Sequence, residues 1–365
     1  MKIIRRYLFK EISAAVAFVT LGFLGLFFFF DLVDELRWIT QSQAGYNLGM
    51  GLIYVLLQIP SHLYELLPIT VLIGTIYVIA RLAVSSEFTI LRTSGLGPGR
   101  ALGILSTVGL VFAVSTFLLG DYVAPATDLK VQLMQVRFHG RITNGQIGTW
   151  MKERQNHTSF NVNIGGMSTA GLLNQVGLYE FDEQGQLVTI TRGKTADILD
   201  HVWRLHDVQR IELPSANSPQ QLVRQHLDEF DWPTQITADM AATMVLKPDR
   251  MKTLDLFQYI RHLSNNGQQA QQYEIEFWRK VFYPLSCLVM VVLALPFAYL
   301  HFRGGNIASY VFGGLMAGIS FFFLNNVFGY MGNLQNWTPW FVAAAPAMVY
   351  SLISLGALSW LVLRR

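Results

Sequence analysis

The sequence predicts a polytopic α-helical membrane protein with six transmembrane helices and a β domain inserted between the third and fourth. The chain has 365 residues, of which 52% are hydrophobic and only 14% are charged. A soluble domain usually carries about 25% charged residues. The apolar residues also gather in long runs, whereas a run of period-two alternation occupies the middle of the chain. These observations favour membrane spans around one folded extramembrane domain.

Six apolar runs are long enough to cross a bilayer, which takes about 20 helical residues. The second run contains Pro60 and Pro68, where we expect kinks. The fifth is rich in glycine, which permits close helix approach. The basic N-terminus is not a cleaved signal, because Asp31, Asp34 and Glu35 follow its apolar run in place of small residues. The predicted spans are 12–30, 48–80, 101–119, 281–299, 307–330 and 339–363.

The basic residues near the span ends predict the orientation, because cytoplasmic loops carry an excess of Lys and Arg. With the N-terminus in the cytoplasm, only Arg37 stands out on the outer short loops. Both termini are then cytoplasmic, and the segment from about Asp121 to Lys280 lies outside. The cations on the cytoplasmic side are Lys2, Arg5, Arg6, Lys10, Arg81, Arg92, Arg100, Arg303, Arg364 and Arg365.

The outer segment alternates with period two between about Arg141 and Leu246, which is typical of a mostly antiparallel sheet, sandwich or jelly roll. Asp182 to Gly185 has turn composition, and Leu199 to His201 separates two further strands. After Pro248 the spacing becomes helical and ends at Asn265-Asn-Gly267. The predicted strands are 161–164, 177–181, 187–191, 195–198, 202–205 and 208–213.

A short charged segment, Arg81 to Arg100, separates the second and third runs on the cytoplasmic side. Ser85 or Ser86 is expected to cap a helix of about three turns that Gly95 ends. Glu87 falls in its first turn, and Phe88 and Leu91, with Arg92 beside them, give it an apolar and a charged face. Such a helix fits a groove on a partner, although an ordinary interfacial loop helix is the alternative.

No catalytic, metal-binding or nucleic-acid-binding pattern stands out. Gly193-Lys-Thr195 lacks the earlier glycine of a phosphate-binding loop, and the single Cys287 builds neither a disulfide nor a thiolate metal site. We therefore expect a protein that is not an enzyme and binds no cofactor or nucleic acid itself. His201 and His206 are expected on the surface. Polar residues in or near the spans mark candidate functional positions, with headgroup solvation as the alternative; they include His62, Glu65, Asp121, Asn325 and Asn326.

Several strings, spread in order along nearly the whole chain, resemble the lipopolysaccharide-export permease family (LptF/LptG) of Gram-negative bacteria, and its LptG branch most. The strings are Leu32-Val-Asp-Glu-Leu36, Ser86-Glu87 with Ser94-Gly-Leu96, Val123-Ala-Pro125, Val202-Trp-Arg-Leu205, Phe277-Trp-Arg-Lys280 with Pro284-Leu-Ser286, and Gly318-Ile-Ser-Phe321 with Val327-Phe-Gly329.

The resemblance implies an inner-membrane ABC transporter subunit that pairs with an LptF-like permease over an LptB-like ATPase dimer, which holds the ATP and Mg. The segment 84–96 would be the coupling helix, with Glu87 as its matching acid. Lipopolysaccharide would enter a cavity between the permeases from the outer leaflet. A periplasmic jelly roll would pass the lipid to LptC-like and LptA-like bridge proteins, which would deliver it to the outer membrane.

The implied division is 1–136 for the first three spans, 137–250 for the β domain, and 251–365 for a linker helix and the last three spans. A lipid anion needs cations for its phosphates and apolar walls for its chains. The candidates are Arg37, Lys130, Arg137, Phe29 and Phe30. Asp31 and Ser61 stand where some relatives carry lysines, so those phosphate contacts do not transfer. A membrane assembly or signalling protein that recruits partners through its β domain is the alternative function.

Overall fold

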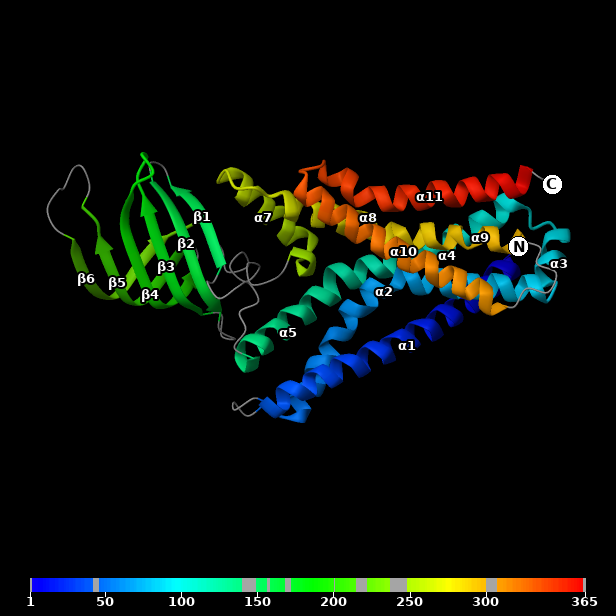
Figure 1. Cartoon of the computed structure of the whole chain (residues 1–365), viewed down its shortest axis with the longest axis horizontal. Coiled ribbons are helices and arrows are strands. Elements are labelled where there is room, and N and C mark those ends of the chain that lie inside the picture. Colours follow the sequence, from blue (N-terminus) through cyan, green and yellow to red (C-terminus); the bar gives the residue numbers. More distant parts are fainter. Residues whose placement is uncertain are drawn as a thin grey trace. The chain divides into compact units, whose positions relative to one another are not determined.

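The computed structural model describes residues 2–41, 46–139, 149–155, 158–167, 172–199, 201–214, 222–236, 248–299 and 307–363 (Figure 1). The chain divides into two compact units. The first comprises Met1–Glu35, Val55–Pro125 and Glu274–Arg365, and the second comprises Leu36–Tyr54 and Ala126–Tyr273. Arg303, Arg364 and Arg365, three of the predicted cytoplasmic cations, lie outside the described residues.

Six of the described helices are long and apolar enough to cross a membrane, which confirms the predicted number. Each overlaps one predicted apolar run, several continue beyond it, and the last part of the fourth run forms a separate short helix. The helices are α1 (Lys2–Gln41), α2 (Leu48–Val84), α4 (Pro98–Leu118), α8 (Gln271–Leu293), α10 (Ile307–Leu334) and α11 (Pro339–Leu363). α2 continues as one helix through both Pro60 and Pro68.

Short elements connect these spans. The helix α3 (Glu87–Thr93) lies between α2 and α4, and α9 (Leu295–Tyr299) follows α8. α4 continues into a π-helical turn, η1 (Leu119–Val123), and then into α5 (Ala124–His139). A π-helical turn carries an extra residue, and its changed hydrogen bonding frees backbone groups for other partners.

Within the first unit, α2 and α8 are the most enclosed spans, and α1 and α10 are the least enclosed. The predicted close approach of the glycine-rich fifth span is confirmed. A Cβ at Gly314 would lie 2.7 Å from Ile76 Cδ1, and one at Gly318 would lie 2.9 Å from Ile69 Cγ2. The two glycines are four residues apart, so they form one ridge of α10 against α2.

Two other glycines of the first unit lie against the backbone of a neighbouring helix. A Cβ at Gly109 of α4 would lie 2.8 Å from Leu288 Cα of α8, and one at Gly74 of α2 would lie 2.8 Å from the Val16 backbone nitrogen of α1. Backbone cannot move aside as a side-chain tip can. Glycine at these two positions therefore determines how closely the helix axes approach.

The second unit contains one antiparallel sheet whose six strands follow the chain order (Figure 1). The strands are β1 (Thr149–Gln155), β2 (Thr158–Met167), β3 (Leu173–Phe181), β4 (Leu187–Leu199), β5 (Val202–Glu212) and β6 (Val223–Pro233). The inserted antiparallel domain is thus confirmed, and its described strands form an up-and-down meander. The segments predicted at 187–191 and 195–198 are one continuous strand, β4.

The predicted turn between β3 and β4 is present. Gly185 has a φ of 77°, Gly185 donates its backbone N–H to the Asp182 carbonyl, and Asp182 Oδ1 accepts from the Gln186 backbone N–H at 2.7 Å. The glycine takes the left-handed conformation that side chains disfavour, and the aspartate side chain satisfies a turn amide.

The strands β3, β4 and β5 change the face that they bury at one row of residues, which we call the crease. Gln175 in β3, Lys194 in β4 and Asp207 in β5 face one another in register, yet none has an assigned pairing partner. Gln175 and Asp207 have φ values of 51° and 52°. On either side of this row the buried positions change from odd to even numbers, as from Leu205 to Val208. The left-handed conformation of Gln175 and Asp207 therefore rotates β3 and β5 at this row. Each strand then buries odd-numbered side chains on one side of the row and even-numbered side chains on the other.

The helix predicted after Pro248 is α7 (Thr253–Asn265), preceded by the short helix η2 (Pro248–Arg250). Its stop is confirmed, since Gly267 has a φ of 65° and the Gln268 N–H donates to the Leu263 carbonyl. The Arg154 backbone N–H donates to Asn266 Oδ1 at 2.8 Å, which ties the helix end to β1. The buried face of α7 carries Leu256, Tyr259, His262 and Leu263.

Candidate functional site

The helix α3 of the predicted coupling segment has seven residues, or about two turns, rather than the expected three. Phe88 is buried, and Leu91 packs beside it against the apolar core of the first unit. Both side chains therefore hold α3 on its own bundle. Ile90 is 62% exposed and is the apolar residue of the outward face.

The charged residues of α3 point away from the core. Glu87 and Arg92 are both exposed, and Glu87 Oε2 accepts a hydrogen bond from the Tyr7 hydroxyl at 3.2 Å. A carboxylate in the first turn is favourable beside the positive helix end. Tyr7, on α1, was not among the predicted residues, because nothing in the sequence pairs positions 80 residues apart.

The predicted hydroxyl cap is wrong. Ser86 is the residue before the helix, but it has a φ of 62° and makes no side-chain capping bond, while Ser85 Oγ donates to the Leu82 carbonyl at 3.4 Å. The tight passage from α2 into α3 requires the left-handed conformation at Ser86, and this directs the hydroxyl away from the first-turn amides.

Among the lipid candidates, Phe29 and Phe30 on α1 are both more than half exposed, and their rings meet edge to face with centroids 5.8 Å apart. On the same helix, Asp31 Oδ2 lies 2.8 Å from His62 Nε2 of α2, and the His62 ring stacks on Phe27. Asp31 thus has a side-chain partner on α2 within the chain.

The three candidate cations belong to the second unit. Arg37 is exposed on α1, and Lys130 is exposed on α5. Arg137 lies in the last turn of α5, but its side chain is outside the described residues. Arg37 and Lys130 lie on different helices, and their binding of lipid phosphates stays a prediction.

Arg279 ties α8 to the neighbouring span α10. Arg279 Nη1 donates to Glu276 Oε1 and Nη2 donates to the Asn325 carbonyl of α10, both at 2.8 Å. A Cβ at Gly329 would collide with the guanidinium, so this glycine provides its space. Arg279 and Gly329 come from two of the strings quoted for the resemblance. The sequence shows that both strings resemble the family, but it does not show that they contact each other.

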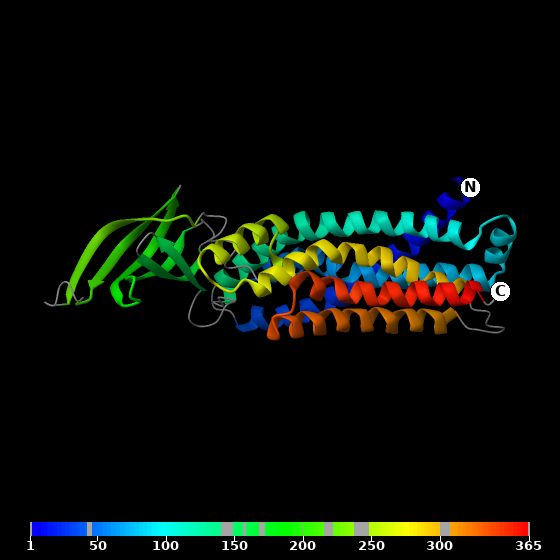
Figure 2. The ribbon, with the colours of Figure 1, turned by 90° about the horizontal axis from the view of Figure 1, so that it is seen from above.

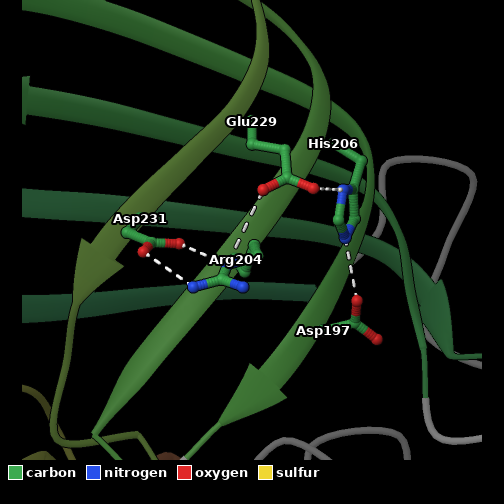
Figure 3. Close-up of polar contacts among 5 residues, drawn as sticks. All are labelled: Asp197, Arg204, His206, Glu229 and Asp231. Atoms are coloured by element: carbon green, nitrogen blue, oxygen red, sulfur yellow. Dashed lines mark hydrogen bonds and ion pairs between the residues drawn. The ribbon is translucent and has the colours of Figure 1, made fainter.

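A charged cluster on the sheet was also missed (Figure 3). Arg204 Nε donates to Asp231 Oδ1 at 2.8 Å, and the guanidinium lowers the pKa of that carboxyl. His206 lies between two carboxylates, with Nε2 2.8 Å from Asp197 and Nδ1 3.3 Å from Glu229. His206 is half-buried rather than free on the surface. No group of three such side chains in the described ranges is placed to hold a metal ion.

The cluster could not be read from the sequence because its members come from three strands. Thr195 pairs with His206, and His206 pairs with Glu229 across β4, β5 and β6. The strand β6 itself was not predicted. Only its register brings Glu229 and Asp231 beside the charged residues of β5.

Comparison with known proteins gives the same family along the whole chain. The sequence profile described as "Lipopolysaccharide export system permease LptF/LptG" matches residues 6–364. The chain is 27% identical to the lipopolysaccharide export system permease protein LptG of Escherichia coli strain K12, over all of this chain and 98% of that protein. It is 24% identical to the protein of the same name from Haemophilus influenzae strain Rd, over 99% of this chain and 98% of that one.

The family match agrees with the described structure. That structure has six apolar helices long enough to cross a membrane, with an antiparallel sheet between the third and the fourth. The match and the structure together identify the chain as a multi-pass inner-membrane permease subunit. The chain belongs to the LptF/LptG family of lipopolysaccharide export permeases, and among its members it is most like LptG.

Proposed function

We propose that this permease takes lipopolysaccharide from the outer leaflet of the inner membrane and passes it to a periplasmic bridge for delivery to the outer membrane. ATP hydrolysis in an LptB-like dimer drives the transfer, and an LptF-like permease forms the other half of the cavity. LptC-like and LptA-like proteins receive the lipid. In this arrangement both termini are cytoplasmic, and the β domain is periplasmic.

The observation that carries the proposal is how α3 is attached. Phe88 and Leu91 fix the helix to the bundle core, and α3 is continuous in sequence with α2 and α4. A partner that binds Glu87, Ile90 and Arg92 and then moves would therefore displace the spanning helices α2 and α4 together with α3. A loosely attached loop helix would absorb such a displacement instead.

The exposed apolar spans support the cargo side of the proposal. α1 and α10 bury little of their apolar surface within this chain, and Phe29 and Phe30 project from α1. In a bilayer such faces contact lipid chains or another subunit. In the β domain, Phe160 packs on the buried Trp232 and leaves part of its own ring exposed. These apolar surfaces suit a lipid that must remain out of water.

The test places a photo-crosslinking residue at Phe29 or at Phe160 in the reconstituted complex with its ATPase and partner permease. We expect lipopolysaccharide to crosslink at position 29 without ATP and to reach position 160 only with ATP. A pattern that is indifferent to ATP, in a complex that hydrolyses ATP, would reject transport and favour an assembly or signalling role.

A second arm tests the coupling residue. Glu87→Ala should abolish the ATP-dependent crosslink at position 160 while leaving the ATP-independent crosslink at position 29. The matched control is Glu183→Ala, which removes an exposed acid of the β3–β4 turn. If Glu87→Ala behaved like this control, α3 would not be the coupling element.

A further inference from the structure

A pocket of about 810 Å³ lies between the first turns of α1 and the first half of α4, within the first unit. Its volume is in the range of ligand sites, which is about 300 to 1,000 Å³. Four of its lining residues are the cations Lys2, Arg5, Arg6 and Arg100. None of the lining residues is acidic. The N-terminus of the chain and the start of α4 lie at the same end of the bundle (Figure 2).

The cations face the pocket at helical spacing. Lys2, Arg5 and Arg6 are at positions i, i+3 and i+4 of α1, so they occupy one face of that helix. No acidic side chain in the described part of the chain pairs with these three. Arg100 uses Nη1 to donate to the Gly95 carbonyl at 3.0 Å, which leaves its other donors available.

The nearby carboxylates are already engaged elsewhere. Glu11 Oε2 accepts from Arg81 Nη2 at 2.5 Å, and Glu87 accepts from Tyr7. Four like charges around one opening repel one another unless an anion lies between them. The charge of the opening therefore favours a negatively charged ligand.

The rest of the pocket is mostly apolar and has most of the depth of one membrane leaflet. Its wall on α4 runs from the cation Arg100 through Gly103 to Val111, always on one helix face. The eight residue steps from Gly103 to Val111, at about 1.5 Å each, span roughly 12 Å. Half of a bilayer's hydrocarbon core is about 15 Å. A groove with cations at one end and this apolar length suits a phospholipid molecule of the adjacent leaflet.

We propose that this pocket binds an anionic phospholipid, with its phosphate among Lys2, Arg5, Arg6 and Arg100 and an acyl chain along α4. A zwitterionic lipid fits less well, because its ammonium group would enter a cluster of cations that lacks a carboxylate. The proposal requires only that the chain lies in a membrane. It stands apart from the proposed transport of lipopolysaccharide, whose entry is placed in the other leaflet.

The experiment is native mass spectrometry of the full chain in the complex in which it purifies, titrated with phosphatidylglycerol or phosphatidylcholine of equal chain length. We expect tighter binding of phosphatidylglycerol. Arg5→Gln with Arg6→Gln should weaken it on the order of 25-fold, at about fivefold per removed cation. Lys10→Gln is the matched control, since Lys10 is an exposed cation of α1 that does not line the pocket.

A second variant blocks the acyl groove without changing charge. A Cβ at Gly103 meets no atom within 4 Å, so Gly103→Leu fits the fold while it fills the pocket. This variant should lose phosphatidylglycerol binding at least about tenfold, in line with the apolar area it excludes. Gly356→Leu in α11 is the control, because a Cβ there also meets open space.

Four results would overturn the proposal. One is equal affinity for the two phospholipids. Another is binding that Arg5→Gln with Arg6→Gln weakens no more than Lys10→Gln does. The third is equal binding of the soluble headgroup glycerophosphoglycerol, and the fourth is binding that Gly103→Leu leaves unchanged. Either of these last two would make the site an anion site without a lipid chain.

Discussion

Lys280 Nζ donates a hydrogen bond to the Gly120 carbonyl at 3.0 Å, which joins α8 to the π-helical turn that follows α4. Lys280 is 7% exposed, and its ammonium group also lies 5.9 Å from the centre of the Tyr64 ring. A Cβ at Gly120 would collide with that ring, so the glycine lets Tyr64 approach. A π-helical turn leaves backbone groups available for other partners, and here the Gly120 carbonyl accepts its hydrogen bond from the buried Lys280.

Lys280→Met should destabilise the protein by about 1 to 3 kcal/mol, because it removes the donor for a buried carbonyl. The measurement is thermal unfolding of the purified complex in detergent. Lys10→Met removes an exposed lysine and should leave the midpoint unchanged. An unchanged midpoint in Lys280→Met would mean that water or another donor replaces the ammonium group.

Gly109→Ala should destabilise the bundle by about 1 to 3 kcal/mol, because its methyl group would lie 2.8 Å from Leu288 Cα and force α4 away from α8. Gly103→Ala on the same helix has open space around its Cβ, and it should stabilise by up to about 1 kcal/mol through helix propensity. Opposite shifts of the two unfolding midpoints are expected. Equal shifts would contradict the close crossing of the two helices.

Phe88→Ala should release α3 from the bundle, because Phe88 is its buried contact. We expect faster proteolysis within residues 84–97 and loss of ATP-driven transport. Ile90→Ala removes an exposed side chain, so it should leave the proteolysis rate unchanged and affect only binding of a partner. If both variants were cut at the wild-type rate, Phe88 would not hold the helix in place.

His262 on α7 should make stability depend on pH. Burial lowers the pKa of His262 below its ordinary value of 6.5, and the nearby Glu153 opposes this shift. The unfolded chain therefore binds more protons as the pH falls through 6.5, so this contribution is full above that pH and declines below it. His262→Gln should flatten the fall in unfolding midpoint between about pH 7 and pH 5.

The control for this prediction is His201→Gln, since His201 is exposed directly before β5. It should retain the wild-type slope of unfolding midpoint against pH. A steeper acid loss in His262→Gln than in the wild type would mean that protonated His262 stabilises the fold, which contradicts the lowered pKa.

The six spans and the β insertion could be predicted because length and hydropathy decide them. The turn at Gly185 and the helix stop at Gly267 could also be predicted, because each needs a positive φ. The strand β6 could not. Its residues alternate little in hydropathy, since most of its side chains are exposed and polar residues stand at neighbouring positions. Propensity therefore gave no signal, and the strand forms by pairing with β5.

Hydropathy also predicts where the short helix around Glu87 lies, but not which of its residues face the bundle. The segment around Glu87 stands out because charges interrupt two apolar runs. Which apolar residue of α3 faces inward depends on how the bundle receives it, and Phe88 and Leu91 face the core while Ile90 does not. The contact between Arg279 and Asn325 joins two spans, and no spacing along one helix foretells it.

The crease through Gln175, Lys194 and Asp207 limits how this domain can change in length. A residue inserted into one strand on one side of the row would turn the rest of that strand over, so its buried side chains would face solvent. The neighbouring strands change faces at the same row, and they could not follow unless they gained a residue too. Insertions and deletions should therefore accumulate in the β-turns, whereas the distance from each turn to the crease stays constant among relatives.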